Sequence, residues 1–331
     1  MTPAAHNRLC SGLVLVLVLV LPCALLAATA SAQTYPTRPV RYIAPSSVGS
    51  GNDFIARVVV SDVVAVLGQQ IIVDNRAGAG GNVAAEIASR APADGYTLMQ
   101  VSSTLAINSS VTRNMPWDLV RDFAPVALLA MQPNLVAVNA GLQVNTIAEL
   151  VKLAKSKPGA INYSSAGPGS NSFLAAELLN SLAGIKMVHV PYKGGGPAMT
   201  AAAAGETALM IGPPATALPL IQQGKLRGVA ISSRRRLAEF PQWPTVAETV
   251  PGYEFDGWYG LLAPARTPRA ITYLWYRQVY ATLAKPAIVK LLNGAGYFPA
   301  PADQPVDFGP FMRAEITKLA KIVQMTGAAE N

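Results

Sequence analysis

Short apolar runs alternate with stretches of helical periodicity along most of the chain. In the first half this pattern predicts strands at 40–44, 70–73 and 96–101, with helices at 53–67 and 83–89 between them. The apolar residues of the first helix stand at near-helical spacing, and Gly68 follows the last of them, as glycine often does after a helix. A β-α-β-α-β order predicts a parallel sheet with helices on both faces.

A second alternation begins near residue 146. Thr146 and Glu149 form a capping box ahead of an apolar helical stripe, and Pro158 ends that helix because proline cannot donate a helical hydrogen bond. The pattern then predicts strands at 161–164, 187–192, 207–211 and 226–231, with helices at 171–183, 197–204 and 216–223. Two α/β modules are the simplest account of both halves.

Two extended apolar passages connect the modules. The first runs from Phe123 to Val138 with a break at 132–134, and the second runs from Tyr253 to Ala263; helices at 268–283 and 307–325 follow. We therefore expect domain 1 to comprise residues 33–130 and 256–331, and domain 2 residues 131–255. Two crossings make a hinge, and the cleft between two such modules is a favoured ligand site.

The first 32 residues have the layout of a secretory signal peptide. Arg8 precedes an apolar run from Leu13 to Leu21, and small residues end at Ala30-Ser31-Ala32. The run is short for a membrane span, which takes about 20 apolar residues. We expect export to the periplasm with cleavage after Ala32. A lipid anchor on Cys23 fits poorly, because a proline rather than a small residue precedes it.

Cleavage changes the chemistry that is available. Both cysteines and His6 lie in the removed segment, which leaves His189 as the one histidine of the mature chain. This excludes disulfides and thiol catalysis, and it disfavours a zinc site, so we expect no metal, no cofactor and no catalytic residues. The net charge of +8 loses only Arg8. The basic residues are scattered, and no aromatic residues interleave with the cluster 234–236, so we expect no nucleic-acid partner.

Three predicted loops join a strand to the start of a helix. Glycine allows close backbone approach, and free N–H groups at a helix start favour an anion. The loops are Ser46-Ser47-Val48-Gly49-Ser50-Gly51-Asn52 with Asp53, then Ser102-Ser103-Thr104, then Ala166-Gly167-Pro168-Gly169-Ser170; Gly212, at the end of a later strand, completes the candidate set. Any βα loop needs such residues as turns and caps, so each loop alone is weak support for binding. The glycine spacing matches neither a dinucleotide fingerprint nor a phosphate loop.

Two ionisable residues near these loops have ordinary structural interpretations. Asp53 opens its helix, where a carboxylate complements the helix dipole; facing a cleft, it would repel an anion and accept an ammonium group. His189 lies on a predicted strand, where a hydrogen-bonded, partly buried histidine is the simpler interpretation than a general base. The aromatic pair Trp258-Tyr259 is interpreted as packing at the hinge.

Motifs along the whole mature chain resemble one known family. They are 44–45 with 49–53 and 56–57, 74–82, 94–98, 122–126, 163–167, 189–194, 224–227 and 244–248, all in order. They resemble the Bug family, the extracytoplasmic receptors of tripartite tricarboxylate transporters. The resemblance implies a two-domain periplasmic binding protein of type II. It also implies a small carboxylate in the interdomain cleft, held by loop backbone, hydroxyls and water, and two membrane subunits of the transporter as partners. We expect a monomer.

Two departures from the family pattern bear on the ligand. The family often has an aromatic residue where Ser46 stands, and often has Asp-Asn where Gly212-Pro213 stand. The second departure argues against an ammonium-bearing ligand and favours plain carboxylic acids.

Two alternatives to a transport receptor remain open. One is the same fold presenting a ligand to a sensor kinase. The other is a secreted hydrolase that uses Ser164 or Ser165 with His189, although no Gly-x-Ser-x-Gly elbow surrounds either serine.

Overall fold

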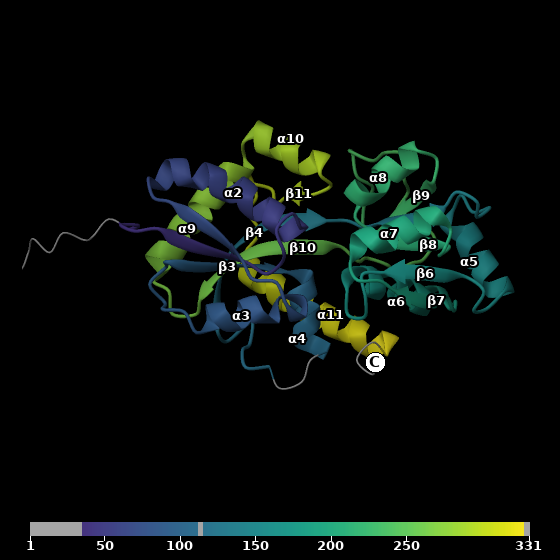
Figure 1. The fold of residues 1–331 in the computed structure, drawn as a ribbon, viewed down its shortest axis with the longest axis horizontal. Helices are drawn as coiled ribbons and strands as arrows, with labels where there is room; N and C mark the ends of the chain where they lie inside the picture. Colours follow the sequence, from purple (N-terminus) through teal and green to yellow (C-terminus); the bar gives the residue numbers. More distant parts are fainter. Residues whose placement is uncertain (1–34, 112–114, 328–331) are drawn as a thin grey trace, which may run out of the picture. The chain divides into compact units, whose positions relative to one another are not determined.

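A computed structural model describes residues 35–111 and 115–327 (Figure 1). The chain divides into two compact units, residues 1–37 and residues 38–331, and every described helix and strand belongs to the second. The expected signal peptide and its cleavage site lie outside the described residues. The second unit contains two separate β-sheets flanked by helices, which confirms the predicted α/β class.

The first sheet has six strands in the order β11-β4-β10-β3-β1-β2. The central β1 pairs in parallel with β2 and with β3, as the β-α-β-α-β pattern predicts. The strands are β1 (Val40–Ala44), β2 (Ile71–Asn75), β3 (Thr97–Ser102), β4 (Phe123–Gln132), β10 (Gly257–Pro264) and β11 (Phe298–Pro299). However, β10 lies antiparallel to β3 and to β4, so the sheet is mixed. The parallel prediction holds for β1, β2 and β3, and the returning passage adds an antiparallel strand between β3 and β4 that the pattern of the first half did not indicate.

The second sheet has five strands in the order β7-β6-β8-β5-β9. The strands are β5 (Leu135–Asn139), β6 (Asn162–Ser165), β7 (Val188–Pro191), β8 (Leu209–Gly212) and β9 (Leu226–Ile231). β6 is parallel to β7 and β8, whereas β5 is antiparallel to β8 and β9. The mixed topology has the same origin as in the first sheet, since β5 is itself one of the passages between the sheets.

Helices cover both faces of each sheet (Figure 1). In the first module they are α2 (Gly51–Leu67), α3 (Asn82–Ser89), α4 (Ser103–Val111), α9 (Arg269–Leu283), α10 (Pro286–Gly294) and α11 (Phe308–Thr326). In the second they are α5 (Ile147–Ser156), α6 (Asn171–Ala183), α7 (Gly195–Ala204) and α8 (Pro214–Gln222); short 3₁₀ turns are η1 (Ala79–Gly81) and η2 (Val246–Glu248). α10 and β11 were not predicted. α4 was likewise given no predicted bounds, and the remaining α-helices lie within a few residues of theirs.

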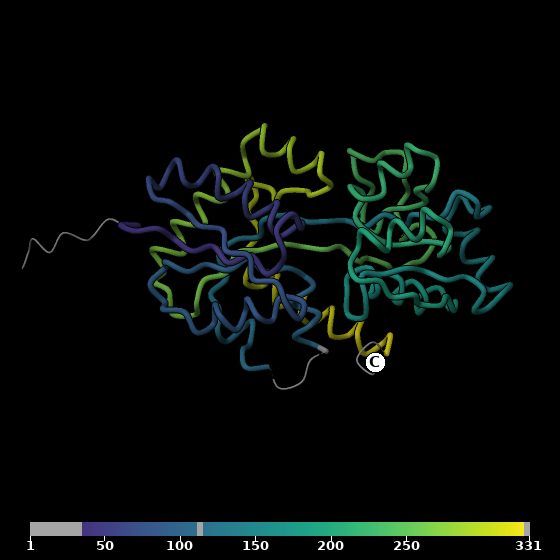
Figure 2. The backbone as a smooth tube through the Cα atoms, in the orientation of Figure 1, coloured from purple at the N-terminus to yellow at the C-terminus, as the bar shows by residue number. Residues whose placement is uncertain are grey.

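The backbone passes twice between the sheets (Figure 2). The passage predicted at 123–138 is β4 in the first sheet and β5 in the second, broken between Gln132 and Leu135, and the second passage continues into β10. The two passages meet beside the end of β9. There the Asn134 amide side chain donates to the carbonyl of Phe255, and its backbone N–H donates to Ser232 Oγ.

Candidate ligand-binding site

The first loop caps the start of α2. Ser50 is the N-cap residue, and its hydroxyl accepts from the Asp53 N–H at 3.3 Å and lies 2.5 Å from Ser46 Oγ. Gly49 has φ +81°, which favours glycine, while Ser47 is exposed. The side chain of Asn75 donates to the Ser46 carbonyl at 3.1 Å and so ties this loop to β2.

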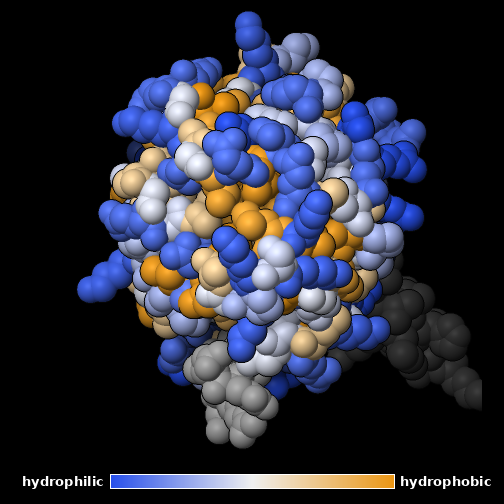
Figure 3. Space-filling model, turned by 90° about the vertical axis from the view of Figure 1, so that its right-hand side faces the viewer, coloured by the Kyte–Doolittle hydropathy of each residue, from blue (hydrophilic) through white to orange (hydrophobic). Residues whose placement is uncertain are grey.

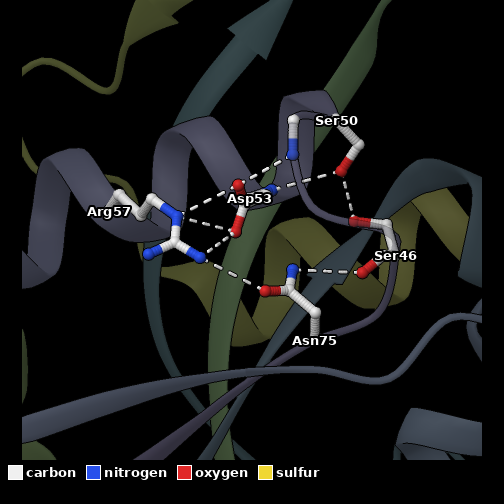
Figure 4. A network of polar contacts seen from close by, with 6 residues as sticks. Ser46, Ser50, Asp53, Arg57 and Asn75 are labelled. Atoms are coloured by element: carbon white, nitrogen blue, oxygen red, sulfur yellow. Dashed lines mark hydrogen bonds and ion pairs between the residues drawn. The ribbon is translucent and has the colours of Figure 1, made fainter.

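Asp53 is the centre of a polar network that holds this loop (Figure 4). Its side chain is buried, and it accepts from the Gly49 N–H at 2.9 Å and from Arg57 Nε at 2.9 and 3.0 Å. The hydrogen bond from Arg57 holds the pKa of Asp53 below its usual range. The carboxylate therefore supports the loop, and the Gly49 N–H is committed to it.

Two donors at the start of α2 remain open. In the part of the chain that the structure describes, no hydrogen bond occupies the backbone N–H of Gly51 or of Asn52. Gln100, which is buried, fixes the orientation of the Asn52 side chain, because Gln100 Nε2 donates to Asn52 Oδ1 at 3.0 Å. Gln100 in turn accepts from the hydroxyl of Tyr42 at 2.9 Å. The positive end of α2 is thus held in place with two N–H groups available.

The second predicted loop is not a loop. β3 ends at Ser102 and α4 begins at Ser103, with Thr104 already in the helix. Ser103 Oγ accepts from Asn171 Nδ2 at 3.0 Å and from the Trp258 N–H at 3.4 Å. This buried hydroxyl therefore joins α4 of the first module, α6 of the second and the returning strand.

The third loop resembles the first in construction. Ser170 caps α6, because its hydroxyl accepts from the Phe173 N–H at 3.3 Å while it donates to the Gly167 carbonyl at 2.6 Å. The Ala166 N–H is committed to Ser172 Oγ. Among the described residues, nothing bonds the backbone N–H of Asn171 or Ser172. Gly169 has φ +70° and lies close to Asn108 on α4, which brings this loop to the first module.

Gly212 contributes differently from the three loops. It is buried at the end of β8, where an added Cβ would stand 3.0 Å from Met210 Cε. Pro213 and Pro214 follow, so the start of α8 lacks two backbone donors. This helix start is therefore the poorest anion site of those predicted.

A tyrosine pair at the junction was not predicted as part of the site. A Cβ at Gly51 would clash with the hydroxyl of Tyr297 and would stand 3.1 Å from that of Tyr259. Tyr259 donates to Gln132 Oε1 at 2.8 Å. Burial raises the pKa of both phenols, so both keep their protons at neutral pH. From the sequence, Tyr259 is interpreted as packing at the hinge, and Tyr297 is not indicated.

Contacts connect the starts of α2 and α6 through this pair. A Cβ at Gly257 would stand 2.7 Å from Asn171 Nδ2 and 3.3 Å from the carbonyl of Gln132, and Gln132 binds Tyr259 beside Gly51. Asn171 also has a buried Oδ1 atom with no partner. The structure thus brings the first and third loops and Ser103 to one junction, whereas Gly212 pairs with Leu135 of β5.

Residues 55–328 of this chain match the sequence model of a protein family, the tripartite tricarboxylate transporter family receptor. The protein BugT of Bordetella pertussis is 34% identical over 306 residues, covering 92% of this chain and 94% of BugT. A Pseudomonas protein encoded between tcbD and tcbE is 33% identical over 264 residues, 79% of each chain. The chain belongs to this receptor family. The resemblance found in the sequence motifs is confirmed.

Solved structures of similar proteins agree with the fold of this receptor. The R. palustris protein Rpa4515, solved with adipate, is 32% identical with a TM-score of 0.79 and covers 88% of this chain and 98% of its own. MatC from Rhodopseudomonas palustris, solved with malate, is 28% identical with a TM-score of 0.76, over 87% and 100%. The periplasmic binding protein BugD is 26% identical with a TM-score of 0.75, over 89% and 99%. The two-domain periplasmic binding fold is thereby confirmed.

A serine and the single mature histidine do meet in this receptor. Ser165 Oγ lies 2.6 Å from His189 Nε2, but Ser165 is fully buried. His189 lies between Tyr163 and Phe173, with ring centroids 5.2 and 4.6 Å away, and burial lowers its pKa. Within the described residues no carboxylate contacts its ring. Because Ser165 is buried and no described carboxylate orients the ring, this geometry gives no support to the hydrolase alternative and favours a packing role.

Replacing His189 with Gln should therefore leave ester hydrolysis unchanged. The folded state favours neutral His189, so its contribution to stability is present above the unfolded pKa and is lost as the pH falls below about 6.5. An assay on a panel of ester substrates, with urea unfolding at pH 7.5 and 5, checks both points. A measurable esterase activity that disappears in the variant would show the packing interpretation to be wrong.

Surface cavities of the described residues also lie away from the junction. One of about 750 Å³ is bordered by Val151, Lys155 and Leu182, and one of about 680 Å³ by Leu182, Lys318 and Met325. Hydrophobic residues gather on the face shown in Figure 3, among hydrophilic ones. In the described ranges, no three His, Cys, Asp or Glu residues are grouped as metal ligands.

No helix among the described residues has the length and hydropathy of a membrane span.

Proposed function

We propose that this receptor captures a small organic carboxylate between its two modules, with the starts of α2 and α6 as the anion site. The observation that carries the proposal is the pair of capped helix starts with open N–H groups. Gly51 and Asn52 offer them from the first module, Asn171 and Ser172 from the second. Each helix start also carries the positive end of a dipole, and both favour a negative charge.

The surrounding charges support this assignment. Asp53, the carboxylate nearest to the first loop, is paired with Arg57 and so does not repel an anion. Serine hydroxyls add donors that rotate to suit the ligand. Rpa4515 and MatC were solved with adipate and malate, which are both dicarboxylates. A dicarboxylate with a length like that of malate or adipate is the ligand class that suits two separate helix starts.

The edge formed by Gly212 argues against an amino acid. Gly212, Pro213 and Pro214 carry no side-chain carboxylate or amide, so this segment offers an ammonium group no charged or side-chain acceptor. We propose a plain acid as the ligand, bound by the residues predicted from the sequence together with Tyr259, Tyr297 and Gln132.

The remaining parts of the proposal follow from the family. We propose that the mature chain begins after Ala32 in the periplasm, acts as a monomer, and delivers its ligand to the membrane subunits of a tripartite transporter. Its proposed domains are 33–130 with 256–331, and 131–255. All strands of the second sheet fall within the second range, which supports these limits. Loss of uptake of the bound acid in cells lacking this chain tests transport; intact uptake with a lost transcriptional response would favour a sensor role.

The acid should bind far more tightly than its amide. Adipate and malate are compared with their monoamides by calorimetry on the mature protein. A hydrogen bond to a charged group contributes about 1.5–3 kcal/mol, so removing one charge should weaken binding about tenfold or more. Equal binding of acid and amide would place the anion site elsewhere.

Two variants localise the site on the third loop. Ser170→Ala should weaken binding about tenfold and, because Ser170 is an N-cap, should cost about 1 kcal/mol of stability. Thr146→Ala, at the cap of α5, is the matched control and should lose stability without losing affinity.

Gly169→Val should bind the ligand more weakly than Ser170→Ala. Gly184→Val, at the other end of α6 with φ +59°, controls for backbone strain. Wild-type affinity in both loop variants would exclude the third loop.

A further inference from the structure

The connection between the modules contains the half-buried carboxyl group of Asp256, which is hydrogen-bonded to a buried serine. Ser232, at the end of β9, is fully buried and donates its hydroxyl proton to Asp256 Oδ1 at 2.6 Å. Ser232 Oγ also accepts from the Asn134 N–H at 2.7 Å. One hydroxyl therefore joins the first passage, through Asn134, to the second passage, through Asp256.

Backbone bonds close the network around that hydroxyl. The Ser232 N–H donates to the Asn134 carbonyl at 2.8 Å, and the Phe255 N–H donates to the Ser232 carbonyl at 3.4 Å. The Asn134 side chain donates to the Phe255 carbonyl at 3.0 Å. Asn134 and Phe255 are 2% and 1% exposed, so water cannot replace these bonds without opening the connection.

The charges around Asp256 do not compensate its ionised form. Lys318 on α11 faces it, but Lys318 also lies 3.6 Å from Glu254 and 3.2 Å from Glu315. Glu254 and Glu315 face Asp256 as well and oppose its ionisation. Arg313 and Lys321 line the cavity shared by Glu254 and Lys318. Lys318 is thus shared among three carboxyl groups.

We propose that Asp256 is a proton-operated latch between the two passages, so that the stiffness of the connection between the modules depends on pH. With its proton, Asp256 accepts from Ser232 and needs no water. Without it, the carboxylate accepts more strongly from Ser232, but burial penalises its charge by more than this bond contributes. Water that enters to solvate the charge then loosens the contacts between Asn134, Ser232 and Phe255. This goes beyond the proposed capture of a carboxylate and does not depend on the ligand.

The direction of the effect follows from the pKa. Burial raises the pKa of Asp256 to about 6, above its ordinary value. A raised folded-state pKa means that the stabilisation is complete below the ordinary pKa and is lost as the pH rises through about 6. The latch is therefore closed at pH 5 and loosened at pH 7.5.

Hydrogen exchange of the mature protein without ligand tests the latch. In the wild type, the amides at 132–135, 231–233 and 253–257 should lose protection between pH 5 and 7.5, after correction for the intrinsic exchange rate, by about tenfold or more. Asp256→Asn should abolish this change. Asp303→Asn, at an exposed aspartate, is the matched control and should keep the wild-type change.

A second measurement does not depend on a variant folding. Carbon-13 NMR of aspartate carboxyl groups in the wild type should show one group titrating near pH 6. Two results would each overturn the proposal: every aspartate titrating below pH 5, or Asp256→Asn retaining the wild-type pH dependence of exchange.

Discussion

Asp53→Ala should destabilise the receptor by about 2 kcal/mol and should release the first loop. Asp53 is 3% exposed and is the acceptor for both Gly49 and Arg57. A hydrogen bond to a charged group contributes about 1.5–3 kcal/mol. Arg57 is 54% exposed and regains water when its partner is lost, so the cost stays below that of stranding a buried charge.

The pH dependence separates this effect from a general packing defect. Because the pKa of Asp53 is lowered in the folded state, its contribution is present above its ordinary value of 3.8 and is lost as the pH falls through the lowered value. Urea unfolding should therefore show a difference between wild type and Asp53→Ala at pH 7 that shrinks at pH 3. Asp53→Asn should lie between them, since it keeps an acceptor for the Gly49 N–H.

A control and an opposing outcome complete the test. Asp303→Ala, at an exposed position, should change stability by less than about 0.5 kcal/mol. If Asp53→Ala unfolds like the wild type at pH 7, the network in Figure 4 does not hold the loop.

The helices and the parallel strand pairs were predictable because their signals are local. Ser50, Thr146 and Ser170 are caps with hydroxyls that accept from the backbone three residues on, and that spacing is visible in the sequence. The antiparallel insertion of β10 was not predictable, because no local pattern states which strands a returning passage will pair with.

The site was predicted in part for the same reason. The capped starts of α2 and α6 are local features, and the structure shows open N–H groups at both. The role of Ser103 as a contact between modules, and the tyrosine pair beside Gly51, depend on segments more than 60 residues apart in the sequence. Tyr297 follows α10, which the periodicity missed, since this short helix between Pro286 and Gly294 has few flanking signals.

Gly51→Ala should destabilise the receptor in the presence of Tyr297 and should do so much less when Tyr297 is replaced by Phe, which leaves only the contacts of 3.1 Å with the Tyr259 hydroxyl and 3.2 Å with the ring. Gly51 is the first residue of α2 and does not have a positive φ, so alanine would ordinarily be favoured there by about 0.5–1 kcal/mol. Here the new Cβ would clash with the hydroxyl of Tyr297. Overpacking costs about 1–3 kcal/mol, which reverses the sign.

A double-mutant cycle measured by urea unfolding isolates this contact. The losses of unfolding free energy in the two single variants should add up to about 1–2 kcal/mol more than the loss in the double variant Gly51→Ala/Tyr297→Phe, because phenylalanine lacks the clashing oxygen. The ring of Tyr297 stays in place, since it stacks on Phe54 with centroids 5.7 Å apart. Gly68→Ala, at the other end of α2 with open space around it, should show no coupling to Tyr297→Phe. Additive effects of Gly51→Ala and Tyr297→Phe would mean that the hydroxyl does not lie against the start of α2, and that the tyrosine pair does not shape the anion site.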